Sequence, residues 1–118
     1  EYACKAGTTT AFSFGNELKP TEANHAASKI YSPVKVGTYK PNAFGLYDMH
    51  GNVNEWCNDW FKAYPTNSVT DPIGPANGEY RIVRGGTCVL NSFNSRSSNR
   101  NLDLASVGSS VRGFRIAK

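Results

Sequence analysis

The feature that most constrains this chain is the brevity of its apolar segments, which Gly, Pro, Asn and Ser interrupt throughout the 118 residues. Residues 8–42 contain only two short apolar pieces, Phe12-Ser13-Phe14 and Val34-Lys35-Val36. The interrupting residue types favour turns and loops. We therefore predict an α+β domain with little regular secondary structure, in which long ordered loops surround a small antiparallel sheet.

The length of the chain allows one domain with a modest core. We treat residues 1–118 as that single domain. The opening letters EYACKAG are typical of a helix that ends at Gly7, but the start of such a helix is missing. We therefore expect that the domain lacks an N-terminal portion here.

Three segments have the composition of strands. Residues 53–60 predict a strand with mixed alternation, and residues 79–90, EYRIVRGGTCVL, alternate more clearly. Gly85-Gly86 within the second segment predicts a bulge or a close approach of two backbones. Residues 112–118 predict a short closing strand, whereas residues 91–111 are polar and irregular.

The charge of the chain is unevenly distributed. Residues 1–80 carry eight acidic and six basic side chains, whereas residues 81–118 carry seven basic side chains and one acid, Asp103. Such a segment can bind nucleic acid or an anionic ligand. Because no run of five or more Lys or Arg occurs, we favour structural arginines that stack on aromatic rings or hold loop carbonyls.

The three cysteines, Cys4, Cys57 and Cys88, form no CxxC pair and no metal-ligand spacing with His25 or His50. Their odd number argues against a disulfide framework. We favour three free thiols packed as small apolar side chains, with one internal disulfide as the alternative.

Neither a membrane segment nor a signal peptide is predicted. No run of 18 apolar residues occurs. Residues 1–5 also lack the basic and then apolar pattern of a signal peptide. These observations assign no compartment.

Six motifs follow one another along the chain. The most specific is NAFGLYDMHGNVNEWCNDWF at residues 42–61; EYACKAGTTT precedes it, and DPIGP, YRIVRGGT, SRSSNR and RGFRIA follow it. In this order the motifs resemble the formylglycine-generating enzyme and sulfatase-modifying factor family, whose domain is similar to an elaborated C-type lectin fold. The resemblance spans nearly the whole chain, and it implies that this chain is the C-terminal part of a larger domain.

The resemblance implies structural calcium in the turn of the longest motif. The ligands would be the side chains of Asp48 and Glu55 and the carbonyls of Gly51 and Val53. A tight glycine turn lets carboxylate and carbonyl oxygens converge as Ca²⁺ requires. The alternative is that Asp48 caps the turn and Glu55 pairs with an arginine.

A second calcium site of the family is matched only in part. Asn24 and the carbonyl of His25 would be its ligands, but the loop at residues 28–33 is short for the remaining ones. The simpler interpretation of His25 is a surface histidine.

Formylglycine-generating enzymes use two cysteines after an RGGS strand to bind Cu(I) and to oxidise a substrate cysteine with O₂. Soft thiolates suit Cu(I). The matching positions here hold Leu90 and either Asn94 or Ser95, which cannot ligate copper. We therefore expect no copper and no catalytic thiol pair. Cys88 becomes a catalytic candidate only in a shifted alignment that pairs it with Cys57, which otherwise packs in the core.

His50 in the DMHGN turn is a candidate for acid–base chemistry. The sequence offers it no partner nucleophile and no set of metal ligands, and it contains no hydrolase, P-loop or Rossmann motif. We therefore interpret His50 as a structural residue of the turn.

Residues 87–111 depart most from the family pattern. The RGG, SRSSNR and GFR motifs are kept while the residues between them differ in chemistry. This pattern resembles the variable region of the target proteins of diversity-generating retroelements; ordinary drift, or an enzyme relative with different loops, is the alternative. We predict a ligand-contacting surface with Phe93 as its hot spot. Its members are Val89, Leu90, Asn91, Phe93, Asn94, Ser106, Val107 and Ser109.

Three functions are compatible with these observations. The favoured one is a non-catalytic module that binds a protein or another macromolecule, and nucleic acid is not the favoured ligand. The alternative is a copper-dependent oxidase that converts a peptide cysteine of sulfatases to formylglycine. A third is other chemistry with side chains that this chain does not contain.

Overall fold

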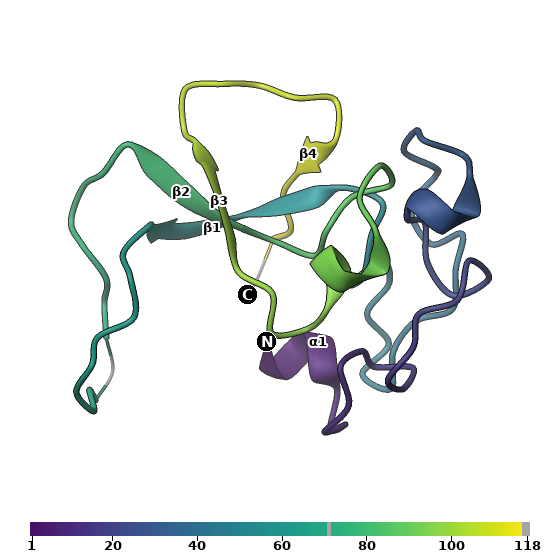
Figure 1. Ribbon diagram of the computed structural model, residues 1–118, viewed down its shortest axis with the longest axis horizontal. Helices are drawn as coiled ribbons and strands as arrows, with labels where there is room; N and C mark the ends of the chain where they lie inside the picture. The colour runs from purple at the N-terminus through teal and green to yellow at the C-terminus, as the bar shows by residue number, and fades with distance from the viewer. Residues whose placement is uncertain (71, 117–118) are drawn as a thin grey trace.

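A computed structural model describes residues 1–70 and 72–116, so Asp71 of the DPIGP motif and the last two residues of the chain lie outside the described part. Loops make up most of the molecule (Figure 1). The regular elements are α1 (Tyr2–Lys5), η1 (Ala26–Ser28), β1 (Asn54–Trp60), β2 (Tyr80–Arg84), η2 (Ser92–Ser95), β3 (Asn101–Leu104) and β4 (Arg112–Gly113).

The four strands form one sheet in the order β3-β2-β1-β4. The strands β1, β2 and β3 pair antiparallel, as predicted. The strand β4 adds to the edge of β1 in parallel, because the loop of residues 105–111 carries the chain from one side of the sheet to the other (Figure 1). The sheet is therefore small and mixed.

The strand predicted over residues 79–90 is shorter in the structure, where β2 ends at Arg84. Gly85 and Gly86 take positive φ angles of 95° and 79°, which an extended strand cannot contain. A Cβ atom added to Gly86 would lie 2.9 Å from Cα of Ser95. The predicted close approach of two backbones is therefore confirmed, and it explains why this position is glycine.

Two further boundaries differ from the prediction. The strand β3 lies inside residues 91–111, which we expected to be irregular; its alternation extends over only four residues, too few to stand out from the polar surroundings. The closing strand β4 covers only Arg112–Gly113. The predicted helix end is confirmed: α1 ends at Lys5, and Ala6 and Gly7 follow in left-handed conformations.

Apolar side chains bury little of the loop-rich part of the molecule. A small cluster contains Phe12, Leu18 and Ala23, with Ala11 and Phe14 packed against it. Buried polar side chains hold the rest of this part, so that side chain to backbone hydrogen bonds replace regular secondary structure. They include Asn24, Asn42, His50 and Asn52, whereas the buried hydroxyls of Thr87 and Ser95 have no hydrogen-bond partner among the described residues.

Asn52 illustrates how such a side chain connects loops that are distant in sequence. Its Oδ1 accepts hydrogen bonds from the backbone N–H of Val34 at 2.9 Å and from Nδ2 of Asn24 at 3.2 Å. Its Nδ2 donates to the carbonyl of Val34 at 3.2 Å. One amide therefore fixes three segments of the chain.

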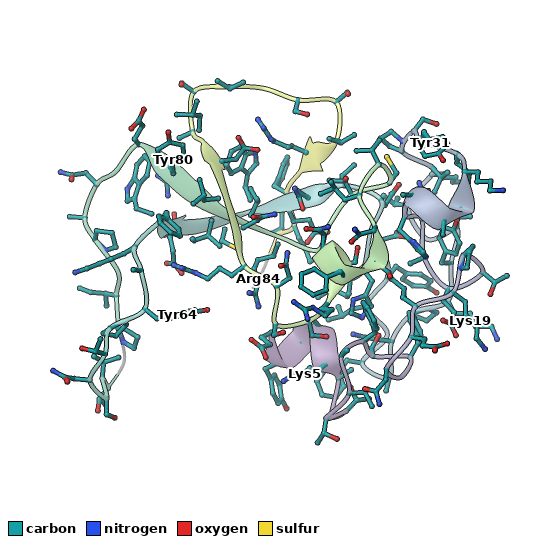
Figure 2. All side chains as sticks on the ribbon, in the orientation of Figure 1. Lys5, Lys19, Tyr31, Tyr64, Tyr80 and Arg84 are labelled. Carbon is teal, nitrogen blue, oxygen red and sulfur yellow. The ribbon has the colours of Figure 1, made fainter. Side chains whose placement is uncertain are left out.

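The sheet and α1 meet at Arg84. This side chain points from the end of β2 toward α1 (Figure 2). One terminal nitrogen donates to the carbonyl of Ser97 at 2.9 Å and lies 3.6 Å from a carboxylate oxygen of Glu1. No helix among the described residues is long and apolar enough to cross a membrane.

Candidate functional site

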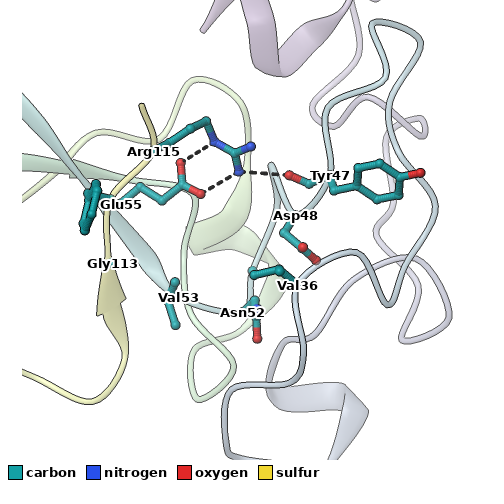
Figure 3. Close-up of a pocket in the computed structure, with 10 residues that line it drawn as sticks. Val36, Tyr47, Asp48, Asn52, Val53, Glu55, Gly113 and Arg115 are labelled. Atoms are coloured by element: carbon teal, nitrogen blue, oxygen red, sulfur yellow. Dashed lines mark hydrogen bonds and ion pairs between the residues drawn. The ribbon is translucent and has the colours of Figure 1, made fainter. Parts of the chain in front are cut away.

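The turn of the longest motif and the C-terminal segment enclose a cavity of about 380 Å³ (Figure 3). All four residues that the resemblance named as calcium ligands line it: Asp48, Gly51, Val53 and Glu55. The turn forms because Asp48, Gly51 and Asn52 take left-handed conformations with φ of 54°, 76° and 64°. The predicted ligands therefore come together in space.

Both carboxylates of this cavity already have partners. Glu55 accepts hydrogen bonds from Arg115, at 2.9 Å from Nε and at 2.6 Å from a terminal nitrogen, and the same nitrogen donates to the carbonyl of Tyr47 at 2.9 Å (Figure 3). The bond to Glu55 raises the pKa of Arg115, although burial opposes this rise. Asp48 accepts from the backbone N–H of Gly37 at 2.7 Å.

The contact of Glu55 with Arg115 is the arginine pair that the sequence allowed as an alternative to calcium, whereas Asp48 holds the backbone of Gly37 and has no described hydrogen bond within its own turn. The described residues contain no group of three or more His, Cys, Asp or Glu side chains placed to hold a metal. The residues that line the cavity nevertheless include Asp48 and Glu55, whose carboxylate oxygens are donors of the kind that Ca²⁺ prefers. The donor set fits the ion, and calcium stays a prediction.

Asn24 has one feature of a metal ligand. Its side chain is fully buried; Nδ2 donates to the carbonyl of Ser32 and to Asn52, whereas Oδ1 has no hydrogen-bond partner in the described part of the chain. The carbonyl of His25, the other predicted ligand, already accepts from the backbone N–H of Ser28 at 2.8 Å.

The prediction that His25 lies on the surface was wrong, because only 2% of this residue is exposed. The backbone N–H of Ala26 donates to the carbonyl of Leu90 at 2.9 Å, which places this stretch against the loop that follows Gly86. Neither ring nitrogen of His25 has a hydrogen-bond partner within the described residues.

The three cysteines are free, as the favoured interpretation required. Cys88 is fully buried, and burial raises the pKa of its thiol. Cys57 is half-buried on β1, where burial likewise raises its pKa. No hydrogen bond joins any two cysteines among residues 1–70 and 72–116.

The residues present therefore do not fit a copper site made of two thiolates. Copper binds the thiolate form of cysteine, which a raised pKa disfavours. The positions that match the thiols of the family hold a half-buried Leu90 and either a half-buried Asn94 or a buried Ser95. None of these side chains ligates Cu(I).

His50 is a structural residue, as interpreted from the sequence. Its Nδ1 lies 2.7 Å from the carbonyl of Ser95, and its Nε2 accepts from the backbone N–H of Ser13 at 3.0 Å. These bonds fit the neutral ring with its proton on Nδ1. The rings of Phe12 and Phe14 contact it edge-on. Burial lowers the pKa of His50, which favours the uncharged ring, although the hydrogen bond to Ser95 opposes this shift.

Six of the eight predicted ligand-contacting residues are exposed, and Leu90 and Asn94 are half-buried. They fall into two groups, one in η2 and the loop that leads into it and one in the loop between β3 and β4 (Figure 1). No hydrogen bond or ring contact joins the two groups in the described part of the chain. The hot-spot candidate Phe93 is 59% exposed and lies on η2.

Every arginine of the basic C-terminal segment is engaged by the protein itself, which confirms the structural interpretation. Some guanidinium groups stack on aromatic rings, and others donate to carbonyls or pair with carboxylates. Arg81 stacks on the ring of Trp60 and Arg96 on that of Phe93. Arg84 donates to the carbonyl of Ser97 and Arg100 to that of Lys62. Arg112 pairs with the carboxylate of Asp103 and Arg115 with that of Glu55.

Arg96 lies outside the set of residues predicted to contact a ligand, yet it contacts one of them. Its guanidinium carbon lies 3.5 Å from the centroid of the Phe93 ring. The signal that would have found it is the spacing of three residues, because side chains three apart eclipse one another on a 3₁₀ turn.

Comparison with known proteins agrees with this fold. A family model described as the sulfatase-modifying factor enzyme 1-like domain matches residues 1–118. The chain therefore belongs to this family, whose fold is similar to that of C-type lectins.

The individual relatives carry the names of different enzymes. The chain is 37% identical over 108 residues to the serine/threonine-protein kinase pkn1 of Chlamydia pneumoniae, covering 88% of this chain and 17% of the relative. It is 35% identical over 103 residues to the formylglycine-generating enzyme of Streptomyces coelicolor, covering 74% of this chain and 33% of the relative. The chain thus spans a third or less of the length of these two curated relatives.

Among solved structures, the chain is similar to Treponema denticola variable protein 1, with a TM-score of 0.87 and 32% identity. The match covers 96% of this chain and 42% of that protein. The same scaffold therefore occurs in a protein named for its variability and in a named enzyme.

Proposed function

We propose that this chain is a non-catalytic member of its family that presents residues 87–111 as a ligand-binding surface. The observation that carries the proposal is a contrast within this segment. Its one thiol, Cys88, is fully buried, whereas six of the predicted contact residues, Phe93 among them, are exposed. A segment that hides its reactive group and exposes an aromatic side chain suits recognition better than chemistry.

The binding surface is further proposed to be diversified by a retroelement. The similarity to a variable protein supports this, as does the retention of the structural RGG and GFR motifs around the differing residues. The test is to sequence related genes from the same genome. Siblings that differ mainly between Thr87 and Val111 are expected, and siblings that differ evenly along the chain would contradict diversification.

The alternative function, a copper-dependent oxidase, is favoured by the identity to a formylglycine-generating enzyme. The deciding experiment is an anaerobic titration of the reduced protein with Cu(I), in which the free thiols are counted before and after. We expect no stoichiometric copper binding. Tight binding of one copper per chain that Cys88→Ser abolishes would instead support the oxidase, and Cys57→Ser tests the second ligand of that reading.

Calcium is proposed as a stabilising ion of the cavity beside Arg115. The side chains of Asp48 and Glu55 and the carbonyls of Gly51 and Val53 would hold it, and the ion would add rigidity to the turn. Calcium should raise the melting temperature of the wild type but not that of Glu55→Gln. The exposed Glu79→Gln is the matched control, since it removes the same charge outside the cavity. If calcium raised the melting temperatures of the wild type, Glu55→Gln and Glu79→Gln equally, this site would be ruled out.

A further inference from the structure

We infer that the exposed Phe93 on η2 and the half-buried Arg96 directly after it together recognise a partner protein through an acidic side chain that lies next to an apolar one. This inference rests on the proposed binding function and names the chemistry of the ligand. It is argued from the rigidity of η2, the unused hydrogen-bond donors of Arg96 and the charge of the surrounding segment.

Contacts with buried residues hold the turn that carries the pair. The carbonyl of Ser95 lies 2.7 Å from Nδ1 of the buried His50, and Gly86 packs against the backbone of Ser95. Below the turn, the backbone N–H of Ser97 donates to the carbonyl of Ala11 at 2.9 Å. The segment on either side of Phe93 therefore cannot shift without breaking buried contacts.

The exposed side of the turn is also held in place. Nδ2 of Asn94 donates to Oδ1 of Asn91 at 2.9 Å, and Nδ2 of Asn99 donates to the carbonyl of Asn94 at 2.8 Å. By contrast, in the loop of residues 105–111 the described hydrogen bonds to segments distant in sequence are those of Ala105 and Val111, at its two ends, whereas Val107 and Ser109 bond only to neighbouring residues. A surface that is already ordered loses less conformational entropy when it binds, so η2 is the better anchor of the two loops.

The pair combines an apolar ring with an oriented positive charge. Nε of Arg96 donates to the carbonyl of Phe93 at 3.1 Å, which holds the guanidinium group 3.5 Å from the ring centroid. The two terminal nitrogens of Arg96 have no hydrogen-bond partner within the described residues. These are the donors that bind a carboxylate in a bidentate manner.

No carboxylate of the described residues pairs with Arg96. Between residue 81 and residue 116 the one acid is Asp103, which pairs with Arg112. Phe93 is 59% and Val89 is 45% exposed, so an apolar side chain of the partner can pack beside the charge. The positive charge of Arg96 thus favours an acidic side chain of the partner. The exposed apolar side chains favour an apolar side chain next to that acidic one.

Protein is favoured over nucleic acid for two reasons. Arg96 covers one face of the Phe93 ring, the kind of face on which a base would stack. The other arginines of the segment are already held by carbonyls, carboxylates or rings of the protein, so they form no track of free positive charges along a phosphate backbone.

The test is selection of binders from a displayed library of random peptides of about twelve residues against the intact chain, followed by affinity measurements on the selected peptides. The inference expects peptides with Asp or Glu within two positions of an aromatic or large aliphatic residue. Arg96→Gln should weaken their binding about tenfold, the typical effect of losing a charge-assisted hydrogen bond. The peptide affinity of Arg96→Lys should lie between those of the wild type and Arg96→Gln, because this variant keeps the charge and loses the planar stack.

Arg81→Gln is the matched control. Arg81 stacks on Trp60 at 3.9 Å, so this change removes the same kind of pair away from η2. It should leave peptide affinity unchanged. Thermal unfolding of each variant shows that the fold is kept before affinities are compared.

The outcomes separate this inference from the proposed function. Peptides without acidic residues, or equal affinity of wild type and Arg96→Gln, would overturn the inference, as would selective binding of an oligonucleotide in place of peptides. If Phe93→Ala still abolishes binding in such a case, the proposed surface stands and only its ligand chemistry was wrong. If neither Phe93→Ala nor Arg96→Gln weakens binding, the proposed surface fails as well.

Discussion

Two parts of this molecule are built on different principles. In the loop-rich part, residues 8–52 and 85–100, buried amide side chains and one imidazole hold the backbone of distant segments together. In the sheet, β1–β4, arginine side chains stack on half-buried aromatic rings such as Trp56 and Trp60. Figure 1 shows the loops of the first part gathered beside the sheet.

The difference teaches where substitutions are tolerated. A buried polar group that loses its partner keeps its desolvation penalty, so each such contact is costly to remove. A stack that stays in contact with water contributes little, because solvent screens the charge. The proposed binding surface lies where the two parts meet, with rigid polar contacts beneath it and exposed side chains above.

The largest effect is expected where two backbones of the loop-rich part touch. Gly86→Ala would place a Cβ atom 2.9 Å from Cα of Ser95 at a φ of 79°. We expect a loss of more than about 3 kcal/mol in the free energy of unfolding, measured with urea. Gly108→Ala is the control, since an added Cβ there meets nothing within 4 Å. Similar losses in both variants would show that the close approach does not matter.

A smaller loss is expected at the amide that connects three segments. Asn52→Ala leaves the backbone groups of Val34 and Nδ2 of Asn24 without their partner. The free energy of unfolding should fall by about 2 kcal/mol. The exposed Asn101→Ala should change it by less than about 0.5 kcal/mol. An equal change in the two variants would contradict the contrast between buried and exposed polar groups.

His50 makes the loop-rich part sensitive to acid. Burial lowers its pKa in the folded state below the ordinary value of 6.5, so the unfolded chain binds the proton more readily. Its contribution to stability is fully present above that value, and it is lost as the pH falls through 6.5 toward the folded pKa. Unfolding followed between pH 8 and pH 5 should show this loss in the wild type. The slope should flatten in His50→Gln; a slope unaffected by His50→Gln would refute the assignment.

The smallest effect is expected in the sheet. Arg81→Gln removes a guanidinium group stacked on Trp60, and we expect a loss of about 0.5 kcal/mol. Lys35→Gln, at an exposed position, should have no measurable effect. If Arg81→Gln proved as costly as Asn52→Ala, the two parts of the molecule would not differ as described.

The sequence predicted those features that depend on local chemistry. The Gly85-Gly86 pair predicted a close approach of two backbones, and the residues of β1 predicted a strand. The absence of a run of basic residues predicted that the arginines have structural roles such as stacking on rings. The strand β3 escaped because four residues carry too little alternation. His25 was misplaced because its burial depends on a loop more than sixty positions away, at Leu90.

Taken alone, the sequence determined the family and the α+β class, because motifs and residue types need no partner to be recognised. Only the tertiary structure decided which polar groups are buried, that Glu55 and Asp48 already have partners, and that Arg96 covers Phe93. These facts arise from contacts between segments far apart in the chain or from the geometry of a 3₁₀ turn. No local pattern of residues encodes the distances on which they depend.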